Sequence, residues 1–369
     1  TDTFGKVQFV YAWKLVPTDK TPAGKRDDIS LREKEKEIQK DLDDGIDTIG
    51  KKMTVCELYA KQNRHRGNVR HNTTKGRERL MKLLEADKLG SCPIDSVKLS
   101  DAKEWALRMK EKGISYKTIS NDKRSLKAAF YTAIQDDCIR KNPFDFQLNT
   151  VIEDDTEPKV PLTAEQEESL LSFMESDSVY QKYRDEVIIL LGTGLRISEL
   201  CGLTDTDLDF ESRVINVDHQ LLRSAETGYY IEKPKTQSGI RQIPMSEKVY
   251  EALGRVLENR KGAKATTIDG YSNFLFLNRD GCPKTATSYD NMFRGLAKKY
   301  NKCHEEALPK VMTPHTLRHT FCTNLANAGM NPKALQYIMG HSNITMTLNY
   351  YAHATFASAR AEMERLIAA

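Results

Sequence analysis

Residues 151–161 divide the sequence into two parts that differ in composition and pattern. The stretch is acidic, contains Pro158 and Pro161, and holds few apolar residues. Such a segment has no hydrophobic face to pack, and a residue before a proline is biased away from the helical region. We therefore interpret 151–161 as a linker. A chain of 369 residues is also long enough for two or three domains.

The part upstream of the linker is strongly basic. Residues 51–150 carry 22 Lys+Arg against 12 Asp+Glu, a net charge of +10, whereas the whole chain carries only +4. The rest of the chain is therefore net acidic, and this asymmetry indicates a polyanion as partner of the basic part. Its densest run of cations consists of Lys61, Arg64, Arg66, Arg70, Lys75, Arg77 and Arg79.

Helical periodicity dominates this basic part. Apolar residues recur at helical spacing over 55–63, 73–84, 100–112 and 118–136, which predicts four helices in a small bundle. Residues 1–48 read differently, because aromatic and polar residues alternate over the first 26 and a charged helical pattern follows. We expect a short β-containing segment there, joined by a helix. The chain opens with Thr1 rather than Met, so part of that segment is expected upstream.

The part downstream of the linker mixes helices with short strands. Strand-like runs at 214–217, 229–232 and 241–244 predict one small sheet among longer helices, and residues 355–369 predict a C-terminal helix with an apolar stripe. The expected class is thus mainly α with small β (α+β). No apolar run approaches the roughly 18 to 20 residues that a membrane-spanning helix needs.

Two passages concentrate cations in apolar surroundings. Arg196 lies in LLGTGLRISEL, where packing would enclose it, so it needs an anion: Glu199 nearby or a bound substrate. In PHTLRHTF, helical spacing places His315, Arg318 and His319 on one face. Like charges on one face are costly without an anion, and these donors suit a bound phosphate.

Two further passages add a lysine, a histidine and a pair of tyrosines. Lys235 lies in KPKTQSGIRQIP, where the Gln-Ser-Gly turn predicts a hairpin tip between two strands. In MGHSNITMTLNYYAH, His341 follows a glycine and precedes Tyr350 and Tyr351. The sequence contains no glycine-rich phosphate loop and no carboxylate cluster suited to Mg²⁺. This combination favours phosphodiester cleavage by a side-chain nucleophile, with cations in place of a metal.

These four motifs, in this order over 162–354, resemble the tyrosine recombinase (phage integrase) family. The resemblance implies a catalytic domain of mixed α/β structure at 162–354 and a helical-bundle core-binding domain at 51–150. The segment 1–48 is similar to part of the arm-binding domain in integrases of conjugative transposons. For residues 355–369 the family implies a helix that docks on a neighbouring protomer.

The resemblance also implies a role for each cation. Arg196 and Arg318 would clamp the non-bridging oxygens of the scissile phosphate, and Lys235 would protonate the leaving 5′ oxygen. His315 would assist proton transfer at the nucleophile, and His341 would hydrogen-bond the phosphate.

The nucleophile requires a choice, because family members place it nine or ten residues after the motif histidine. Tyr350 stands at plus nine from His341 and Tyr351 at plus ten. We choose Tyr351, because Tyr351-Ala-His353 preserves the family's Tyr-x-His ending. Tyr350 remains the alternative, and a covalent adduct with DNA distinguishes the two.

The implied activity is site-specific recombination for a mobile element, through a 3′-phosphotyrosyl link and a four-way junction, without metal, ATP or other cofactor. The implied partners are double-stranded DNA and further copies of the chain up to a tetramer, with an excisionase and DNA-bending proteins left open. A bacterial cytoplasmic, nucleoid-associated location follows. Two alternatives stay open: a type IB topoisomerase, which would relax DNA without strand exchange, and a DNA-binding regulator without catalysis.

Overall fold

The structure, a computed structural model, separates into two compact units, Thr1–Glu157 and Pro158–Ala369. It describes residues 32–33, 35–36, 39–40, 47, 50–67, 71–157, 160–260, 266–305, 307–309, 311–351, 363–364 and 367. The strands expected in 1–26 lie outside these residues, as does most of the expected C-terminal helix. The boundary between the units falls within the segment 151–161.

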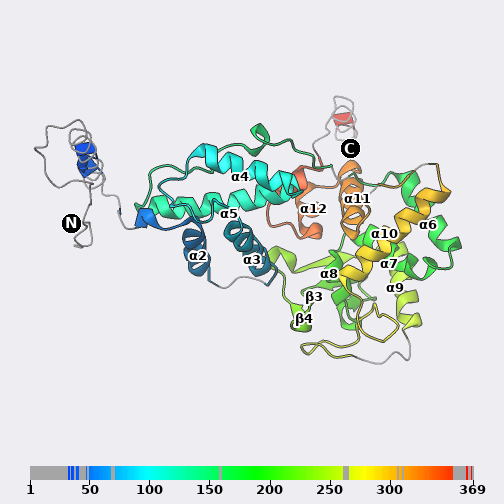
Figure 1. The fold of residues 1–369 in the computed structure, drawn as a ribbon. Helices are drawn as coiled ribbons and strands as arrows, with labels where there is room; N and C mark the ends of the chain where they lie inside the picture. The colour runs from blue at the N-terminus through cyan, green and yellow to red at the C-terminus, as the bar shows by residue number, and fades with distance from the viewer. Residues whose placement is uncertain are drawn as a thin grey trace, which may run out of the picture. The chain divides into compact units, whose positions relative to one another are not determined.

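Over residues 50–157, the first unit is a bundle of four helices (Figure 1). They are α2 (Val55–His65), α3 (His71–Glu85), α4 (Leu99–Glu111) and α5 (Tyr116–Gln135). Helix α2 packs against both α3 and α5, and α4 packs against α5. Each helix overlaps one of the four predicted from periodicity.

Local sequence explains where these helices begin and what they bury. Thr54 caps α2 through a reciprocal pair of hydrogen bonds with Glu57, which satisfies backbone donors that the helix itself cannot. The core is aromatic: Trp105, Phe130 and Phe144 are fully buried, and the Trp105 and Phe144 rings meet edge to face at 5.8 Å. Such pairs add about 0.5–1.5 kcal/mol beyond their buried area.

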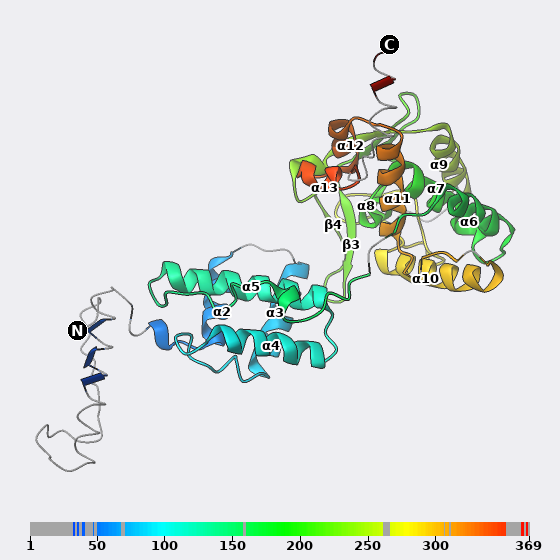
Figure 2. The ribbon, with the colours of Figure 1, turned by 90° about the horizontal axis from the view of Figure 1, so that it is seen from above.

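The second unit is larger and also mainly helical (Figure 2). Its helices are α6 (Ala164–Ser176), α7 (Arg184–Thr193), α8 (Ile197–Gly202), α9 (Glu247–Asn259), α10 (Ala286–Cys303), α11 (Pro314–Asn327), α12 (Pro332–Met339) and α13 (Ile344–Leu348). Helix α7 packs against both α9 and α11, and α12 packs against α11, α13 and strand β5 (Arg241–Pro244). The fully buried Leu190, Leu253, Phe293 and Leu317 belong to one continuous core.

Among the described residues of this unit, strands form two small antiparallel sheets rather than the one that the sequence predicts. Strands β1 (Leu208–Asp209), β2 (Val214–Val217) and β5 form the first sheet, in the order β1-β2-β5. Strands β3 (Gln220–Ser224) and β4 (Gly228–Glu232) form the second. The run 229–232 therefore pairs with β3, which the sequence analysis missed.

This pairing corrects the expected setting of Lys235. The strands before and after it, β4 and β5, belong to different sheets, so Lys235 lies in a connection between sheets and not at a hairpin tip. Turn chemistry at Gln237–Gly239 is present, as a 3₁₀ turn. A turn signal shows that the chain reverses locally, but strand partners depend on contacts distant in sequence.

The architecture confirms the expected class, mainly α with small β. Within the part of the chain that the structure describes, no helix is both long and apolar enough to cross a membrane.

Candidate active site

Two glycine-containing turns set up the arginine cluster, and the first of them precedes Arg196. Gly194 ends α7 with φ +61°, and a Cβ there would lie 2.3 Å from Cδ1 of Phe321. Only glycine fits both that backbone conformation and that close approach. The chain then turns directly into α8, and Arg196 becomes its N-cap residue with Glu199 at the third position.

Glu199 is the buried acceptor at the centre of the cluster. Its carboxylate accepts from the backbone N and Nη1 of Arg196 at 2.8 and 2.7 Å. It also accepts from Nη2 and Nη1 of Arg241 at 2.8 and 3.1 Å. Burial opposes ionisation, but the hydrogen bonds and charge of Arg241, followed by the charges of Arg196 and Arg318, lower the pKa of Glu199 to about 2. The group is therefore a carboxylate at neutral pH.

Arg241, the first residue of β5, was not singled out by the sequence analysis. Its side chain has no exposed surface, and β5 alternates buried and exposed residues with Arg241 on the buried side. A signal was present, because this arginine lies within KPKTQSGIRQIP, the passage that contains Lys235, and begins the alternating strand. An arginine at an inward strand position indicates a buried anion, here Glu199.

Three arginines converge on the C-terminal end of α12. Arg241 Nε donates to the carbonyl of Ile338 at 2.6 Å, and Arg196 Nη2 donates to Gly340 at 2.9 Å. Between these carbonyls, that of Met339 accepts from Nη2 of Arg318. The last carbonyls of a helix have no partners within it and carry partial negative charge, so they suit guanidinium groups. We call Ile338, Met339 and Gly340 the α12 carbonyl end.

Arg318, on α11, is the most deeply enclosed of the predicted phosphate ligands. It is 4% exposed, and its Nη1 donates to the carbonyl of Gly194 at 2.5 Å. Burial, and then the charge of Arg196, lower the pKa of Arg318 to about 9. The guanidinium still remains charged at neutral pH, held by backbone carbonyls. His315, one turn earlier, is exposed.

His341 lies just beyond the α12 carbonyl end and is buried. Its Nδ1 is 2.9 Å from Oγ1 of Thr347 on α13. Burial, followed by the charges of Arg318 and Arg196, lowers the pKa of His341 to about 4. The imidazole is consequently neutral at pH 7, able to donate one hydrogen bond and accept another.

The two adjacent tyrosines have different surroundings. The Tyr350 ring lies 5.0 Å from that of His319, and burial raises the pKa of Tyr350 to about 12 although the charge of Arg318 counteracts it. The Tyr351 hydroxyl points elsewhere and donates to the carbonyl of Met330 at 2.5 Å. Burial also raises the pKa of Tyr351. Of the two, Tyr350 is the one whose hydroxyl group interacts electrostatically with Arg318.

The structure thus brings together Arg196, Arg318 and His341, with Tyr350 beside them. Lys235 is exposed, and the hydrogen bonds and ion pairs given for the described residues of this cluster do not include it. His315 lies near the cluster through His319, with their ring centroids 6.3 Å apart.

The predicted DNA-contacting residues of the first unit differ in their exposure and in whether they form an ion pair within the unit. Lys61 pairs with Asp136 at 2.8 Å, and Arg79 pairs with the buried carboxylate of Asp122. These two cations are therefore partly neutralised within the unit. The exposed members of the run are Arg64, Arg66, Lys75 and Arg79; Lys61 and Arg77 are half-buried, and Arg70 lies outside the described residues.

One group in the described part of the chain has the composition of a metal site. Asp207, Asp218 and His219 place potential ligand atoms within 4.8 Å of one another. Both imidazole nitrogens are already engaged, Nδ1 with Asp218 at 2.6 Å and Nε2 with the carbonyl of Gly202 at 2.7 Å. The histidine thereby ties the end of α8 to the start of β3, which is a structural role.

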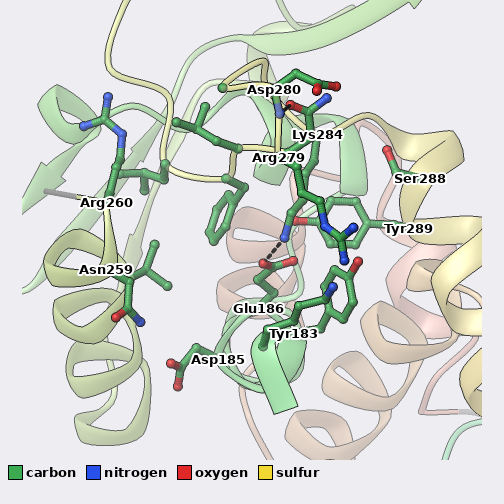
Figure 3. A pocket seen from close by; sticks show the side chains of 17 residues that line it. Tyr183, Asp185, Glu186, Asn259, Arg260, Arg279, Asp280, Lys284, Ser288 and Tyr289 are labelled. Atoms are coloured by element: carbon green, nitrogen blue, oxygen red, sulfur yellow. Dashed lines mark hydrogen bonds and ion pairs between the residues drawn. The ribbon is translucent and has the colours of Figure 1, made fainter. Parts of the chain in front are cut away.

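A cavity of about 990 Å³ lies elsewhere in the second unit and contains none of the predicted site residues (Figure 3). Its lining includes an ion pair between Lys284 and the buried Glu186, drawn as a dashed line in Figure 3. Lys284 also lies over the ring of Tyr183, 4.5 Å from its centroid. This pair is a second buried charge interaction in the unit, and neither of its residues belongs to the arginine cluster.

Comparison with known proteins identifies the family of the chain. Residues 161–358 match the phage integrase family. The chain belongs to the phage integrase family. It is therefore a tyrosine recombinase, an enzyme that cleaves and rejoins DNA at specific sites, as the motifs indicated. Residues 1–42 match the DNA binding domain of the Tn916 integrase.

Individual relatives cover between 72% and 99% of the recombinase. It is 67% identical to the transposase from transposon Tn916 of Enterococcus faecalis, over 99% of this chain and 90% of that protein. It is 30% identical to the tyrosine recombinase XerC of Bacillus pumilus, over 72% of this chain and 80% of the relative. A solved structure of the Tn1549 transposon integrase with circular intermediate DNA is 78% identical, with a TM-score of 0.82. It covers 85% of this chain and 99% of the solved one.

Proposed function

We propose that this tyrosine recombinase is the integrase of a mobile genetic element and acts on double-stranded DNA at element ends, circular intermediates and target sites. The observation that carries the proposal is the cluster of Arg196, Arg318 and His341 at the α12 carbonyl end, with Tyr350 beside it. The relatives support it, because one is a transposon transposase and others were solved with transposon right end and circular intermediate DNA.

In this proposal each polar group has one task at the scissile phosphate. Arg196 and Arg318 bind its non-bridging oxygens, and neutral His341 donates a hydrogen bond to it. Fixed donors that face developing negative charge are the largest source of rate enhancement in many enzymes. His315 accepts the proton of the attacking tyrosine, and Lys235 gives a proton to the leaving 5′ oxygen.

We assign the nucleophile to Tyr350 rather than to Tyr351, the residue preferred from sequence. Two arguments support this. The first is electrostatic: Tyr350 interacts with Arg318, whose charge favours a phenolate and partly offsets the effect of burial on the pKa of Tyr350. The Tyr351 hydroxyl is instead committed to the carbonyl of Met330.

The second argument is spacing. Solved structures of the Tn1549 integrase carry an arginine-to-lysine change at position 225 and a tyrosine-to-phenylalanine change at position 379 of that protein. These positions are 379 − 225 = 154 apart. Arg196 and Tyr350 are separated by the same interval, whereas Tyr351 is one residue further.

In this proposal, cleavage and rejoining require neither a metal nor ATP. The phenolic oxygen of Tyr350 forms a bond to phosphorus as the bond to the 5′ oxygen breaks. The proton from Tyr350 passes to His315, and the leaving oxygen takes one from Lys235. A 5′ hydroxyl from another strand then reverses the step and creates a four-way junction, so the energy of the broken bond is kept in the phosphotyrosyl link.

The other proposals concern binding and assembly. The basic run of the first unit holds the DNA backbone, with Lys61 and Arg79 exchanging their present carboxylates for phosphates. Four protomers assemble on two duplexes, and residues 355–369, largely outside the described residues, join neighbours. The protein works in the bacterial cytoplasm at the nucleoid, with an excisionase and DNA-bending proteins as accessory partners.

The experiment that tests this function is trapping of a covalent adduct. Recombinase is incubated with nicked duplexes that carry the element ends, and protein–DNA adducts are separated on a denaturing gel. We expect adduct with the wild type and with Tyr351→Phe, and none with Tyr350→Phe. Absence of adduct from the wild type would reject the function. If Tyr350→Phe formed adduct and Tyr351→Phe did not, Tyr351 would be the nucleophile instead.

A further inference from the structure

We propose that Arg241 is a positioning residue for DNA cleavage: it fixes the base of the loop that carries Lys235 against the elements that hold Arg196 and His341. The inference rests on the proposed role of Lys235 as general acid. Arg241 does not touch DNA in this account, because its side chain has no exposed surface.

The contacts of Arg241 join three parts of the site. Its fork of donors reaches Glu199 on α8 through two hydrogen bonds, of 2.8 and 3.1 Å. Nε donates to the carbonyl of Ile338 at the end of α12, at 2.6 Å. Nη1 donates to the carbonyl of Gly239, in the Lys235 loop, at 3.1 Å. One guanidinium therefore links the Arg196 helix, the approach to His341 and the loop.

The loop between β4 and β5 is tightly packed at its base. A Cβ on Gly239 would lie 2.4 Å from Cβ of Pro234, so the two ends of the Lys235 turn touch. A Cβ on Gly340 would lie 3.0 Å from the carbonyl oxygen of Ser238 and 3.1 Å from Nη1 of Arg241. The backbone of the loop thus sits directly against the α12 carbonyl end, with Arg241 at the junction.

The tip of the same loop is free to reach a ligand. Lys235 is exposed, four residues before Gly239. A general acid must come within about 2.6–3.2 Å of the atom that it protonates. The ammonium reaches the leaving oxygen reproducibly only if the base of its loop stays in one place, and Arg241 supplies that anchor.

Lysine cannot replace arginine in this role. A guanidinium offers five donors in a rigid planar fork, whereas an ammonium is a compact point charge on a flexible stem. Arg241→Lys keeps the charge next to Glu199 but cannot span Glu199, Ile338 and Gly239 together. The substitution therefore releases the loop while it preserves most of the local electrostatics.

The test compares two leaving groups. One nicked duplex has the ordinary scissile phosphodiester, and the other has sulfur in place of the bridging 5′ oxygen. With sulfur, the Tyr350 oxygen still forms its bond to phosphorus, but the departing thiolate keeps the electron pair of the broken P–S bond. A thiol has a pKa of about 8.5, far below that of an alcohol, so this departure needs no proton from Lys235.

We expect Arg241→Lys to slow cleavage of the ordinary substrate by about 100-fold, as loss of a general acid does. The same variant should cleave the sulfur substrate within about threefold of the wild type, and Lys235→Ala should show the same pattern. Gly239→Ala provides a second route, because it displaces Pro234 while it leaves Arg241 intact. Gly239→Ala should likewise slow cleavage of the ordinary substrate and spare the sulfur substrate. It therefore tests the inference even if Arg241→Lys does not fold.

Lys284→Met is the matched control. It removes one partner of another buried ion pair in the same unit and lowers the melting temperature, but it should slow both substrates equally or not at all. Equal losses on both substrates for Arg241→Lys and Gly239→Ala would overturn the inference, as would failure of sulfur to rescue Lys235→Ala. Failure of the proposed function looks different: the wild type itself would form no adduct with either substrate.

Discussion

At the scale of single residues, the site contains charged side chains whose burial is normally unfavourable. Arg318 and Arg241 are each less than 5% exposed. They are tolerated because Glu199 and backbone carbonyls accept their hydrogen bonds. The sequence revealed that an anion was needed near Arg196 and Arg318 but not that Arg241 shares it. That fact depends on β5 lying beside α8 and α12, which no local pattern encodes.

His341 yields a prediction at this scale. Its pKa is lowered to about 4, by burial and by the charges of Arg318, Arg196, Arg241 and His319. The unfolded chain, with a histidine pKa of about 6.5, therefore binds the proton more readily. The contribution of His341 to stability is complete above pH 6.5 and is lost as the pH falls towards 4.

Urea unfolding at pH 7 and pH 5 measures this effect. Between these values the wild type should lose roughly 2 kcal/mol more of its unfolding free energy than His341→Asn does. Glu199 does not interfere, since its pKa change lies below this window. The same loss in both proteins would show that His341 is not the group responsible.

At the scale of elements, the end of α12 matters more than its length of only eight residues suggests. The αL conformation of Gly340, φ +61°, ends the helix so that its last carbonyls face the arginines. Helices themselves were predictable here, because periodicity and caps are local. The pairing of β3 with β4 was not, and this is why the sequence placed Lys235 on a hairpin.

Gly340→Ala tests the importance of that turn. Left-handed backbone costs a residue with a side chain about 1–2 kcal/mol, and the added Cβ would also meet Ser238 and Arg241. We expect a loss of at least about 1 kcal/mol in unfolding free energy, accompanied by slower adduct formation.

Gly254→Ala is the comparison, since Gly254 lies inside α9 with open space around its Cβ position. Alanine there should stabilise the protein by about 0.5–1 kcal/mol and leave cleavage unchanged. A Gly340→Ala variant as stable and active as this control would contradict the role assigned to the turn.

At the scale of the whole molecule, the proposed function assigns DNA binding and chemistry to different parts of the chain. The excess of positive charge is in residues 51–150 of the first unit, whereas we propose that Arg196 and Arg318 of the second unit bind one phosphate. Composition alone reveals the basic character of residues 51–150, because net charge needs no knowledge of the fold. Which cations are available was not predictable, as the ion pairs of Lys61 and Arg79 show.

Salt dependence of DNA binding distinguishes these cations. Each phosphate contact contributes about 0.9 to the slope of log K against log salt. Replacing both Arg64 and Arg66 with Gln should lower the slope by about 2. Lys61→Gln should lower it less, because Lys61 already pairs with Asp136. Fluorescence anisotropy between about 50 and 200 mM salt provides the measurement.

Tyr350→Phe is the control for that titration, since it removes the proposed nucleophile and no charge. Its salt slope should equal that of the wild type. If the slope of log K against log salt were unchanged after the double substitution at Arg64 and Arg66, other residues would make the phosphate contacts.

The α12 carbonyl end also bears on how the site tolerates sequence change. Its acceptors are main-chain oxygens, so no substitution of the side chains at 338 or 339 can delete them. Substitutions at these two positions are limited only by packing. The donors, in contrast, are the side chains of Arg196, Arg241 and Arg318, and a substitution there removes the hydrogen bonds. The acceptors that orient the arginines are thus insensitive to side-chain substitution at 338 and 339. Changes that abolish activity should concentrate in the donors and in Gly340, which shapes the turn.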